Sequence, residues 1–205
     1  MWRNAPQMRF SRNDFPFLFF NIQEMETSEA IERRRSVRKF KKDDVPDEIL
    51  EKILDAARLA PSWANKQCWK FIVVKDEKLK DEIRKTTGKF TRTWLKDVPL
   101  IIVGCGDPAK SGSHYGLDYY AVDVAIAMQN LILAATDLGL GTCWIGSFDE
   151  AKIKELLDIP EEIRVVGLTP VGYPKTGFVD KTIGIAWSGN RKELKEIVCY
   201  DKWRN

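Results

Sequence analysis

An alternation of arginine and serine gives the first indication of chemistry in this sequence. Arg34, Ser36 and Arg38 alternate just past the expected end of a helix, so in an extended segment their side chains project to the same side. Arginine offers paired donors to a phosphate and serine adds a hydroxyl donor, while the basic residues between them can stay solvated. The spacing therefore predicts an anion site. A basic surface patch or a contact with nucleic acid is the alternative that this stretch alone leaves open.

The side chains of the protein itself are poorly suited to covalent or metal chemistry. His114 is the only histidine, which excludes a histidine metal cluster, and no G-x-S-x-G segment supplies the serine of a Ser-His-Asp triad. The four cysteines are far apart and form no C-x-x-C pair, which argues against a zinc site or a disulfide framework. We therefore expect a bound cofactor to carry the chemistry, no metal, and a reducing, cytoplasmic location.

One glycine-rich segment imitates a dinucleotide-binding motif. The segment 104–109 follows an expected strand and satisfies the pattern G-x-G-x-x-A. A dinucleotide site needs a helix whose free N–H groups meet the pyrophosphate, but Pro108 removes one such donor and Asp107 adds a negative charge. The residues that follow, 110–116, read as a loop. A dinucleotide-binding fold is therefore not expected.

Length and charge limit the domain organisation and the partners that we expect for this chain. With 205 residues the chain suits one domain that buries about 70% of the surface of its unfolded form. Its 33 basic and 30 acidic residues give a net charge of +3, so a nucleic-acid partner would have to rest on local clustering, and we expect none. No apolar run approaches the ~18 residues of a membrane span. Residues 1–24, aromatic and basic, are expected to extend a domain that spans 25–205.

Helices and strands are mixed without a regular βαβ repeat, which predicts an α+β fold. Thr27 can cap a first helix, Pro46 opens a second one, and Pro61 ends it. The longest helical pattern is apolar nearly all round, so that helix should be central and buried. The expected helices are 28–35, 46–60, 119–138 and 150–157, with a helical start in 191–203, and the expected strands are 69–74, 100–103, 142–146 and 164–171.

Four blocks of the sequence, in order along about residues 25–203, resemble the nitroreductase family. The first is AIERRRSVRKF at 30–40, and the second is APSWANKQCW at 60–69, where the family usually reads APS-x-x-N-x-QPW. The third, 123–146, is similar to the central helix of the family and the Cys-Trp-Ile-Gly after it. The fourth combines Val-Gly-Tyr-Pro at 171–174 with 191–198.

This resemblance implies a nitroreductase-like fold, with a central mixed or antiparallel sheet flanked by helices and two chains intertwined in a homodimer. It implies FMN as the cofactor, so the flavin N5 atom would carry the chemistry and no side chain would be catalytic. NADH or NADPH would be the co-substrate, and a small electron-poor molecule would be the acceptor.

The same resemblance gives each residue of the basic stretch a role toward FMN. Arg34 and Ser36 would lie near the phosphate and the ribityl chain, with Arg35 in the same cluster and Arg191 as a second cation on the phosphate side. Arg38 would lie at the N1 and O2 edge of the ring. Two-electron reduction leaves negative charge near N1, which a fixed guanidinium stabilises.

Two further segments complete the implied site. Pro61, Ser62 and Asn65 would reach the flavin of the other subunit, so the site would require a dimer. The segment along the flavin near N5 would comprise Trp144, Ile145, Gly146 and Ser147. The chain departs from the family at Cys68, where proline is usual, and at Gly189, where a second cation near Arg191 is common.

The implied activity is a two-step exchange in which NAD(P)H and then a nitroaromatic or quinone acceptor use one cleft beside the flavin. Reductive dehalogenation, or dehydrogenation of a peptide-like substrate, is the enzymatic alternative that the sequence does not separate from it. A flavin-binding protein without catalysis, or a basic module that contacts nucleic acid through 33–42, is the non-enzymatic alternative. His114 lies in a loop rich in glycine and serine, of the kind that forms a substrate rim, although a solvated loop histidine is the simpler interpretation.

Overall fold

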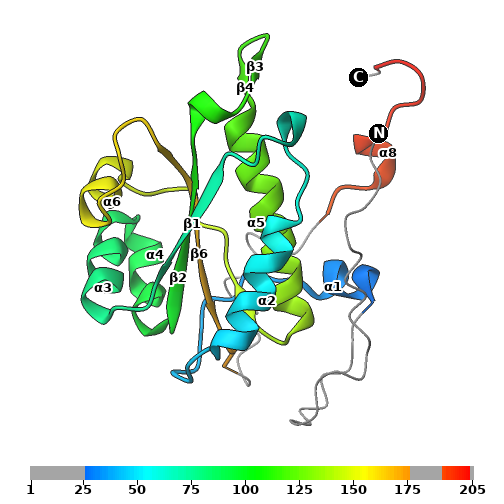
Figure 1. The fold of residues 1–205 in the computed structure, drawn as a ribbon. Helices are drawn as coiled ribbons and strands as arrows, with labels where there is room; N and C mark the ends of the chain where they lie inside the picture. The colour runs from blue at the N-terminus through cyan, green and yellow to red at the C-terminus, as the bar shows by residue number, and fades with distance from the viewer. Residues whose placement is uncertain (1–25, 176–190, 204–205) are drawn as a thin grey trace, which may run out of the picture.

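The computed structural model describes residues 26–175 and 191–203, and the extension 1–24 and Gly189 lie outside these ranges. Its centre is a four-stranded antiparallel sheet in the order β1-β2-β6-β5 (Figure 1). The strands are β1 (Trp69–Val74), β2 (Leu100–Gly106), β5 (Gly141–Thr142) and β6 (Arg164–Gly172). The expected α+β fold with an antiparallel sheet is confirmed.

Helices cover both faces of this sheet (Figure 1). One face carries α3 (Glu77–Thr86), α4 (Lys89–Trp94) and α6 (Glu150–Leu156), and the other carries α2 (Asp47–Arg58) and α5 (Tyr119–Asp137). α1 (Thr27–Arg33) packs on α5, whereas α8 (Leu194–Ile197) lies away from the sheet. The short 3₁₀ turns are η1 (Trp63–Asn65), η2 (Leu95–Asp97) and η3 (Pro108–Lys110).

β2 divides the core into two halves because its side chains alternate between the faces of the sheet. Ile101 and Val103 belong to the cluster under α3, α4 and α6, while Leu100 and Ile102 belong to the cluster under α2 and α5. All four are at most 1% exposed. The apolar run that the sequence shows at 100–103 is thus explained by a strand that is covered on both sides.

α5 is the central helix, as its apolar pattern predicts, because it packs against α1, α2 and all four strands of the sheet. By length and composition it would suit a membrane span, but it packs on β2 and α2 and is a core helix of this fold. Gly104 makes the approach close, because a Cβ there would stand 2.4 Å from the Met128 sulfur. The glycine-rich segment thus serves helix packing. The expectation of burial all round is wrong on one side, where Ile126 is 36% exposed.

A small hairpin links η3 to α5. Its strands are β3 (Ser113–His114) and β4 (Leu117–Asp118), and the turn between them consists of Tyr115 and Gly116. Figure 1 shows that this hairpin projects beyond the end of the sheet. The expectation of a loop at 110–116 is therefore wrong at its end, where a pair of short strands forms.

Other boundaries differ from the expected ones for local reasons. The first helix ends at Arg33 because the backbone of Arg34 turns to ψ 126°, and α8 starts at Leu194 rather than 191. The expected strand 142–146 is limited to β5 and an isolated bridge between Ile145 and Leu168. The register places Pro170, which has no N–H to donate, opposite the gap between them.

Candidate functional site

The basic segment 34–40 lies beside β5 at the edge of the sheet. The Val37 N–H donates to the Thr142 carbonyl oxygen at 2.8 Å, and Ser36 forms a parallel bridge with the same residue. Gly141 lies directly behind the segment, since a Cβ on it would stand 2.8 Å from the side chain of Val37. Glycine at 141 therefore lets the two backbones approach, and this pairing holds Arg34 and Ser36 in an extended segment.

A cavity of about 320 Å³ opens beside this segment. Three of the predicted FMN-binding residues line it, namely Arg34, Ser36 and Trp144. Four lining residues were not predicted: Gln129, Ile132, Thr142 and Cys143. The sequence offered a signal for the last two, which directly precede Trp144, but the side of α5 that faces the cavity is chosen only by tertiary packing. The volume lies at the low end of the ~300–1,000 Å³ typical of ligand pockets.

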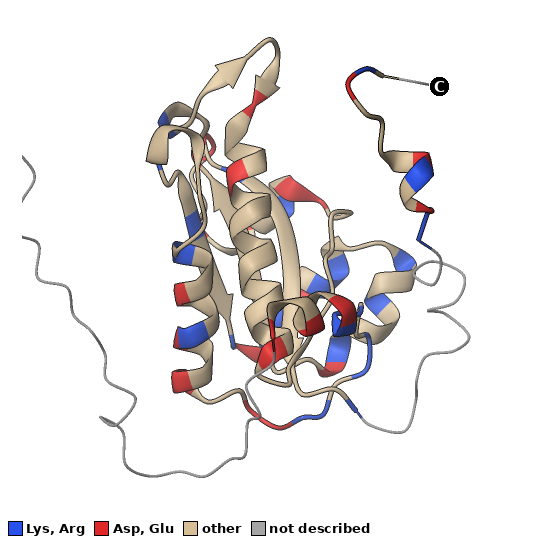
Figure 2. Cartoon of the chain, turned by 90° about the vertical axis from the view of Figure 1, so that its right-hand side faces the viewer, with Lys and Arg blue, Asp and Glu red and all other residues tan. Residues whose placement is uncertain are grey.

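The arginines around this cavity lack acidic partners. Within the described ranges no carboxylate pairs with Arg34, Arg38 or Arg191, and Arg38 donates only to the Ser36 carbonyl at 3.4 Å. Burial lowers the pKa of Arg34, and the nearby positive charges of Arg191 and Arg35 lower it further. Figure 2 shows basic residues gathered around α1 and the segment after it. Such a cluster favours a bound anion, which would relieve this repulsion.

Cys143 places a thiol in the same lining. The residue is 4% exposed, and burial raises the pKa of the thiol despite the opposing effects of Arg38, a hydrogen bond with Ser36, and Arg34. The thiol therefore stays protonated near neutral pH. It provides a neutral surface below the cations and does not balance their charge.

The segment 144–147 emerges from the core at the rim of the cavity. Trp144 is 42% exposed and its ring lies against Gly167, where a Cβ would come within 2.8 Å of it. Ile145 is buried and exchanges two backbone hydrogen bonds with Leu168, at 2.9 and 3.0 Å. Gly146 and Ser147 then follow as exposed residues. Trp144 is therefore not a buried core residue, because nearly half of its surface is open.

The second predicted segment, Pro61 to Cys68, forms a tight loop with an unusual backbone. Ala64, Asn65 and Gln67 have φ angles of 46°, 55° and 49°, in the left-handed region that non-glycine residues rarely occupy. Ser62 stabilises the loop by accepting a hydrogen bond from the Gln67 N–H at 2.9 Å, and the Gln67 amide donates to Asn65 Oδ1 at 3.1 Å. Three such residues within four positions carry backbone strain, which the hydrogen bonds around the loop must hold in place.

Asp123 of α5 anchors this loop from below. Its carboxylate is buried, with the residue 2% exposed, and accepts hydrogen bonds from the Trp63 N–H at 2.9 Å, Ser111 Oγ at 3.0 Å and Cys68 Sγ at 3.5 Å. No ion pair in the part of the chain that the structure describes includes Asp123. The charge is thus stabilised by donors from two loops. Cys68, which departs from the family's proline, is one of those donors.

Within one chain the loop and the cavity lie at different levels of α5. The loop is attached at Asp123, in the first third of the helix, and the cavity is lined by Gln129 and Ile132, further along it. These lining residues are six and nine positions beyond Asp123, which corresponds to about 9 to 14 Å along the axis. Ser62 and Asn65 do not line the cavity. The structure therefore separates two sets of predicted site residues. Arg34, Ser36 and Trp144 line the cavity, and Ser62 and Asn65 belong to the loop.

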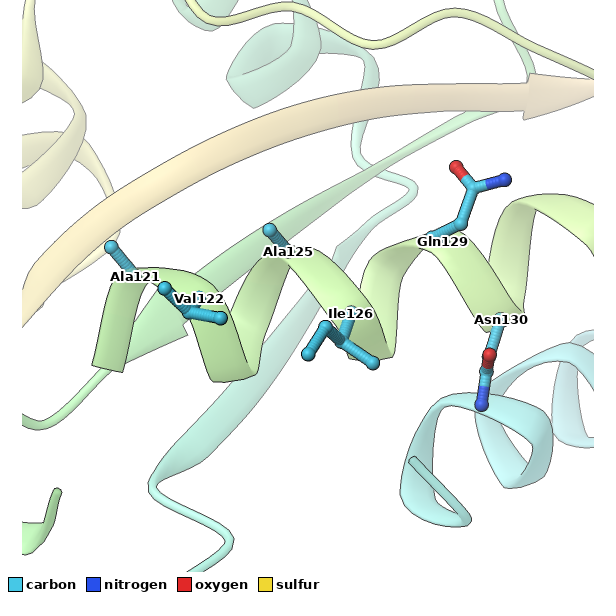
Figure 3. Close-up of a pocket in the computed structure, with 6 residues that line it drawn as sticks. All are labelled: Ala121, Val122, Ala125, Ile126, Gln129 and Asn130. Carbon is cyan, nitrogen blue, oxygen red and sulfur yellow. The ribbon is translucent and has the colours of Figure 1, made fainter. Parts of the chain in front are cut away.

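An open groove of about 540 Å³ runs along α5 between the two sets. Six residues line it in two rows along the helix, as Figure 3 shows: Ala121, Val122, Ala125, Ile126, Gln129 and Asn130. Gln129 also lines the cavity beside Arg34, so the groove leads into it. In Figure 2 this helix is nearly free of charged residues, whereas the adjacent α2 is rich in them. An uncharged helix face that the described residues leave open is typical of an interaction surface.

Comparisons with known proteins place the chain in a family. The model of the "Nitroreductase family" matches residues 31–93 and 85–173. An Archaeoglobus fulgidus protein named "Putative NADH dehydrogenase/NAD(P)H nitroreductase" is 39% identical over 155 residues, which cover 73% of this chain and 86% of that one. A nitroreductase family protein from Clostridium novyi NT is 45% identical, with a TM-score of 0.72, over 74% of this chain and 87% of the other.

A third similarity concerns a solved structure from Clostridium difficile R20291, described as an FMN-dependent nitroreductase. It is 31% identical to this chain, with a TM-score of 0.65, and the match covers 80% of this chain and 98% of that one. The family model spans more than half of the sequence, including the basic segment, the strained loop and Trp144 to Ser147. The chain therefore belongs to the nitroreductase family of oxidoreductases.

Proposed function

We propose that this protein is an FMN-dependent oxidoreductase that uses NADH or NADPH to reduce a small electron-poor acceptor, a nitroaromatic or a quinone. The observation that carries the proposal is the half-buried Arg34, which lines one cavity together with Ser36, has Arg35 and Arg191 nearby, and has no acidic partner among the described residues. The phosphate of FMN is an anion that arginine and serine side chains at such a cavity can bind. The C. difficile relative described as FMN-dependent supports the choice of flavin.

Residues in and around the cavity would hold different parts of FMN. Arg34, Ser36 and Arg191 would bind the phosphate side, with Arg35 adding charge from solvent, and Arg38 would lie at the N1 and O2 edge of the ring. Bound FMN would supply the hydride-accepting N5 atom. The half-exposed Trp144, with Ile145, Gly146 and Ser147 after it, would border the ring and leave its face open to one substrate at a time.

The remaining predicted residues, Pro61, Ser62 and Asn65, are proposed to act on the flavin of a second copy of the chain. Three observations support this. The anchor of the loop on α5 lies about 9 to 14 Å along the helix from the residues of α5 that line the cavity, Ser62 and Asn65 do not line that cavity, and an apolar groove leads from Gln129 toward the loop. A second chain laid along this groove would cover it and could bring its own loop to the cavity of the first. We therefore propose a homodimer with two shared sites.

The cellular setting is proposed on the same grounds. Cys68, Cys105 and Cys143 are buried thiols, which suits a reducing compartment such as the cytoplasm. We also propose that residues 1–24 form an extension and that residues 25–205 form the FMN-binding domain. No role is proposed for nucleic acid or membrane.

Absorbance tests the proposal directly. Purified protein is expected to bind FMN, and NADH or NADPH should bleach its flavin band in the absence of oxygen, with the colour restored by a quinone. Arg34→Gln should weaken FMN binding at least tenfold, while the matched variant Arg33→Gln, on the exposed side of α1 and paired with Glu29, should not. Flavin that binds but is not bleached by either nicotinamide would leave a flavin-binding protein. Equal affinity in both variants would remove Arg34 from the site.

A further inference from the structure

The turn of the β3–β4 hairpin carries an aromatic residue where the backbone disfavours one. Tyr115 and Gly116 have φ angles of 49° and 79°, so the two-residue turn has the type I′ geometry. Asparagine, aspartate and glycine suit its first position, because a side chain such as that of tyrosine is strained in the left-handed region. Tyr115 is also 98% exposed. Neither burial nor turn chemistry accounts for its presence there.

Tyr115 is the end of a row of aromatic rings. Its ring meets that of His114 edge-on, with 4.3 Å between the ring centroids. The centroids of His114 and Trp63 are 6.4 Å apart, and those of Trp63 and Tyr119 are 4.2 Å apart. Trp63 also rests on Gly112, where a Cβ would come within 2.3 Å of the indole. The rings thus connect the tip of the hairpin with the loop that carries Ser62 and Asn65.

Hydrogen bonds join the same two segments at their base. The Asp123 carboxylate accepts from the backbone of Trp63 and from the hydroxyl of Ser111, at 2.9 and 3.0 Å. The Tyr119 N–H donates to the Gly112 carbonyl oxygen at 2.8 Å and closes the hairpin base. The strained loop and the hairpin are therefore held as one unit, and a flavin reached by the loop would have the hairpin tip nearby.

We propose that Tyr115, supported by His114, determines acceptor specificity by stacking on planar electron-poor rings that enter the cleft. The inference rests on the proposed function and on the loop's contact with a flavin. The face of a phenol ring is rich in electron density and is attracted to an electron-poor aromatic ring. The short two-residue turn limits the positions of its backbone, and the contact with the His114 ring limits those of the phenol, which reduces the entropic cost of stacking.

Steady-state kinetics with two acceptors tests this assignment. For Tyr115→Ala we expect kcat/KM for a nitrobenzoate to fall about fivefold to tenfold through KM, while the value for ferricyanide, which is not aromatic, stays unchanged. Tyr115→Phe should retain the preference. Leu117→Ala is the matched control, because this residue is 50% exposed on the same hairpin and has no ring. It should leave both values as they are.

Tyr115→Asn separates a specificity role from a structural one. Asparagine suits the type I′ turn, so this variant should melt at or above the temperature of the original protein and still lose the preference for the aromatic acceptor. An unchanged ratio between the two acceptors in the Ala and Asn variants would overturn the assignment. So would an equal loss with both acceptors together with a weaker dimer in sedimentation, which would make the tip a contact between chains. Failure of the original protein to bind FMN or to oxidise NAD(P)H would instead overturn the proposed function itself.

Discussion

At the scale of single residues, the candidate site is distinguished by what its arginines lack. Arg58, Arg84 and Arg164 each pair with a carboxylate, whereas Arg34 and Arg38 approach the same buried thiol without one in the part of the chain that the structure describes. Unpaired cations in partly buried positions lower the stability of a fold unless a ligand compensates them. We therefore expect the ligand-free protein to be less stable than the FMN-loaded one, by an amount set by the affinity.

Arg38→Ala is expected to lower the two-electron reduction potential of bound FMN. A guanidinium at the N1 edge favours the reduced, negatively charged ring, and its removal takes that preference away. Losing ~1.4 kcal/mol corresponds to a decrease of about 30 mV for a two-electron couple. The potential can be measured by slow anaerobic reduction with a reference dye, with Arg33→Ala as the control. An unchanged or higher potential in the Arg38 variant would remove this residue from its proposed position.

The sequence predicted some residues of the candidate site and missed others, for physical reasons. Arg34, Ser36 and Trp144 could be assigned because their types and spacing carry chemistry in themselves, and all three line the cavity. Gln129 could not be assigned, because the sequence of α5 does not show which side of the helix faces the cavity. Only the packing of the helix decides that. Asp123 had no local signal either, since its donors come from residues 12 to 60 positions away.

At the scale of elements, Asp123 joins α5 to two loops. Asp123→Ala should reduce the free energy of unfolding by about 2 kcal/mol, because buried donors that lose their acceptor keep the cost of desolvation. Asp123→Asn retains one oxygen for the Trp63 N–H and should lose less. Urea unfolding measures both variants. If the alanine variant were as stable as the original protein, the anchoring role assigned to this carboxylate would be wrong.

Glu150 joins α6 to β6 in a way that depends on pH. It accepts from Arg164 at 2.9 and 3.0 Å and from the Val165 N–H at 2.9 Å, and the hydrogen bonds of Arg164 lower its pKa most. Because the pKa in the folded state lies below the unfolded value of ~4.3, the stabilisation is complete above that value. It is lost as pH falls through the folded pKa.

Glu150→Gln should therefore reduce stability by about 1 kcal/mol at pH 7, a modest value because solvent screens the half-exposed Arg164. The difference from the original protein should shrink below pH 4 and approach zero at lower pH, where Glu150 itself is protonated. Thermal unfolding followed across this range checks the prediction. A gap between the two proteins that stays constant down to pH 3 would mean that charge is not the cause.

α3 shows why the sequence did not predict the elements between residues 75 and 99. α3 is mostly charged, so hydrophobic periodicity gives little sign of it, yet its ion pairs and the Asp76 cap on the Leu79 N–H stabilise it locally. Lys80 is 5% exposed and donates to the carbonyls of Val98 and Pro99 at 2.8 Å, a burial that only the folded neighbourhood allows. β1, in contrast, has the predicted bounds because a short β-branched and aromatic run decides its type.

At the scale of the whole molecule, FMN binding and dimerisation should be linked if the site is shared. Whatever binds the dimer better than the monomer shifts assembly toward the dimer by its differential affinity. Sedimentation at low concentration should therefore show that FMN tightens the dimer of the original protein. Asn65→Ala should weaken that tightening, whereas Lys66→Ala, its exposed neighbour in the same loop, should not. A stable monomer that binds FMN as tightly as the dimer would show that one chain owns the whole pocket.

The double attachment of α5 has a consequence for the tolerance of this helix to changes in length. One residue inserted between Asp123 and Gln129 would rotate everything beyond it by about 100° and shift it by about 1.5 Å. The wall of the cavity would then turn away from Arg34 while the strained loop kept its anchor, even if each half folded correctly. Insertions before Tyr119 or after Asp137 would leave that phase intact. The helix is therefore expected to accept no change in the number of residues between its two attachments.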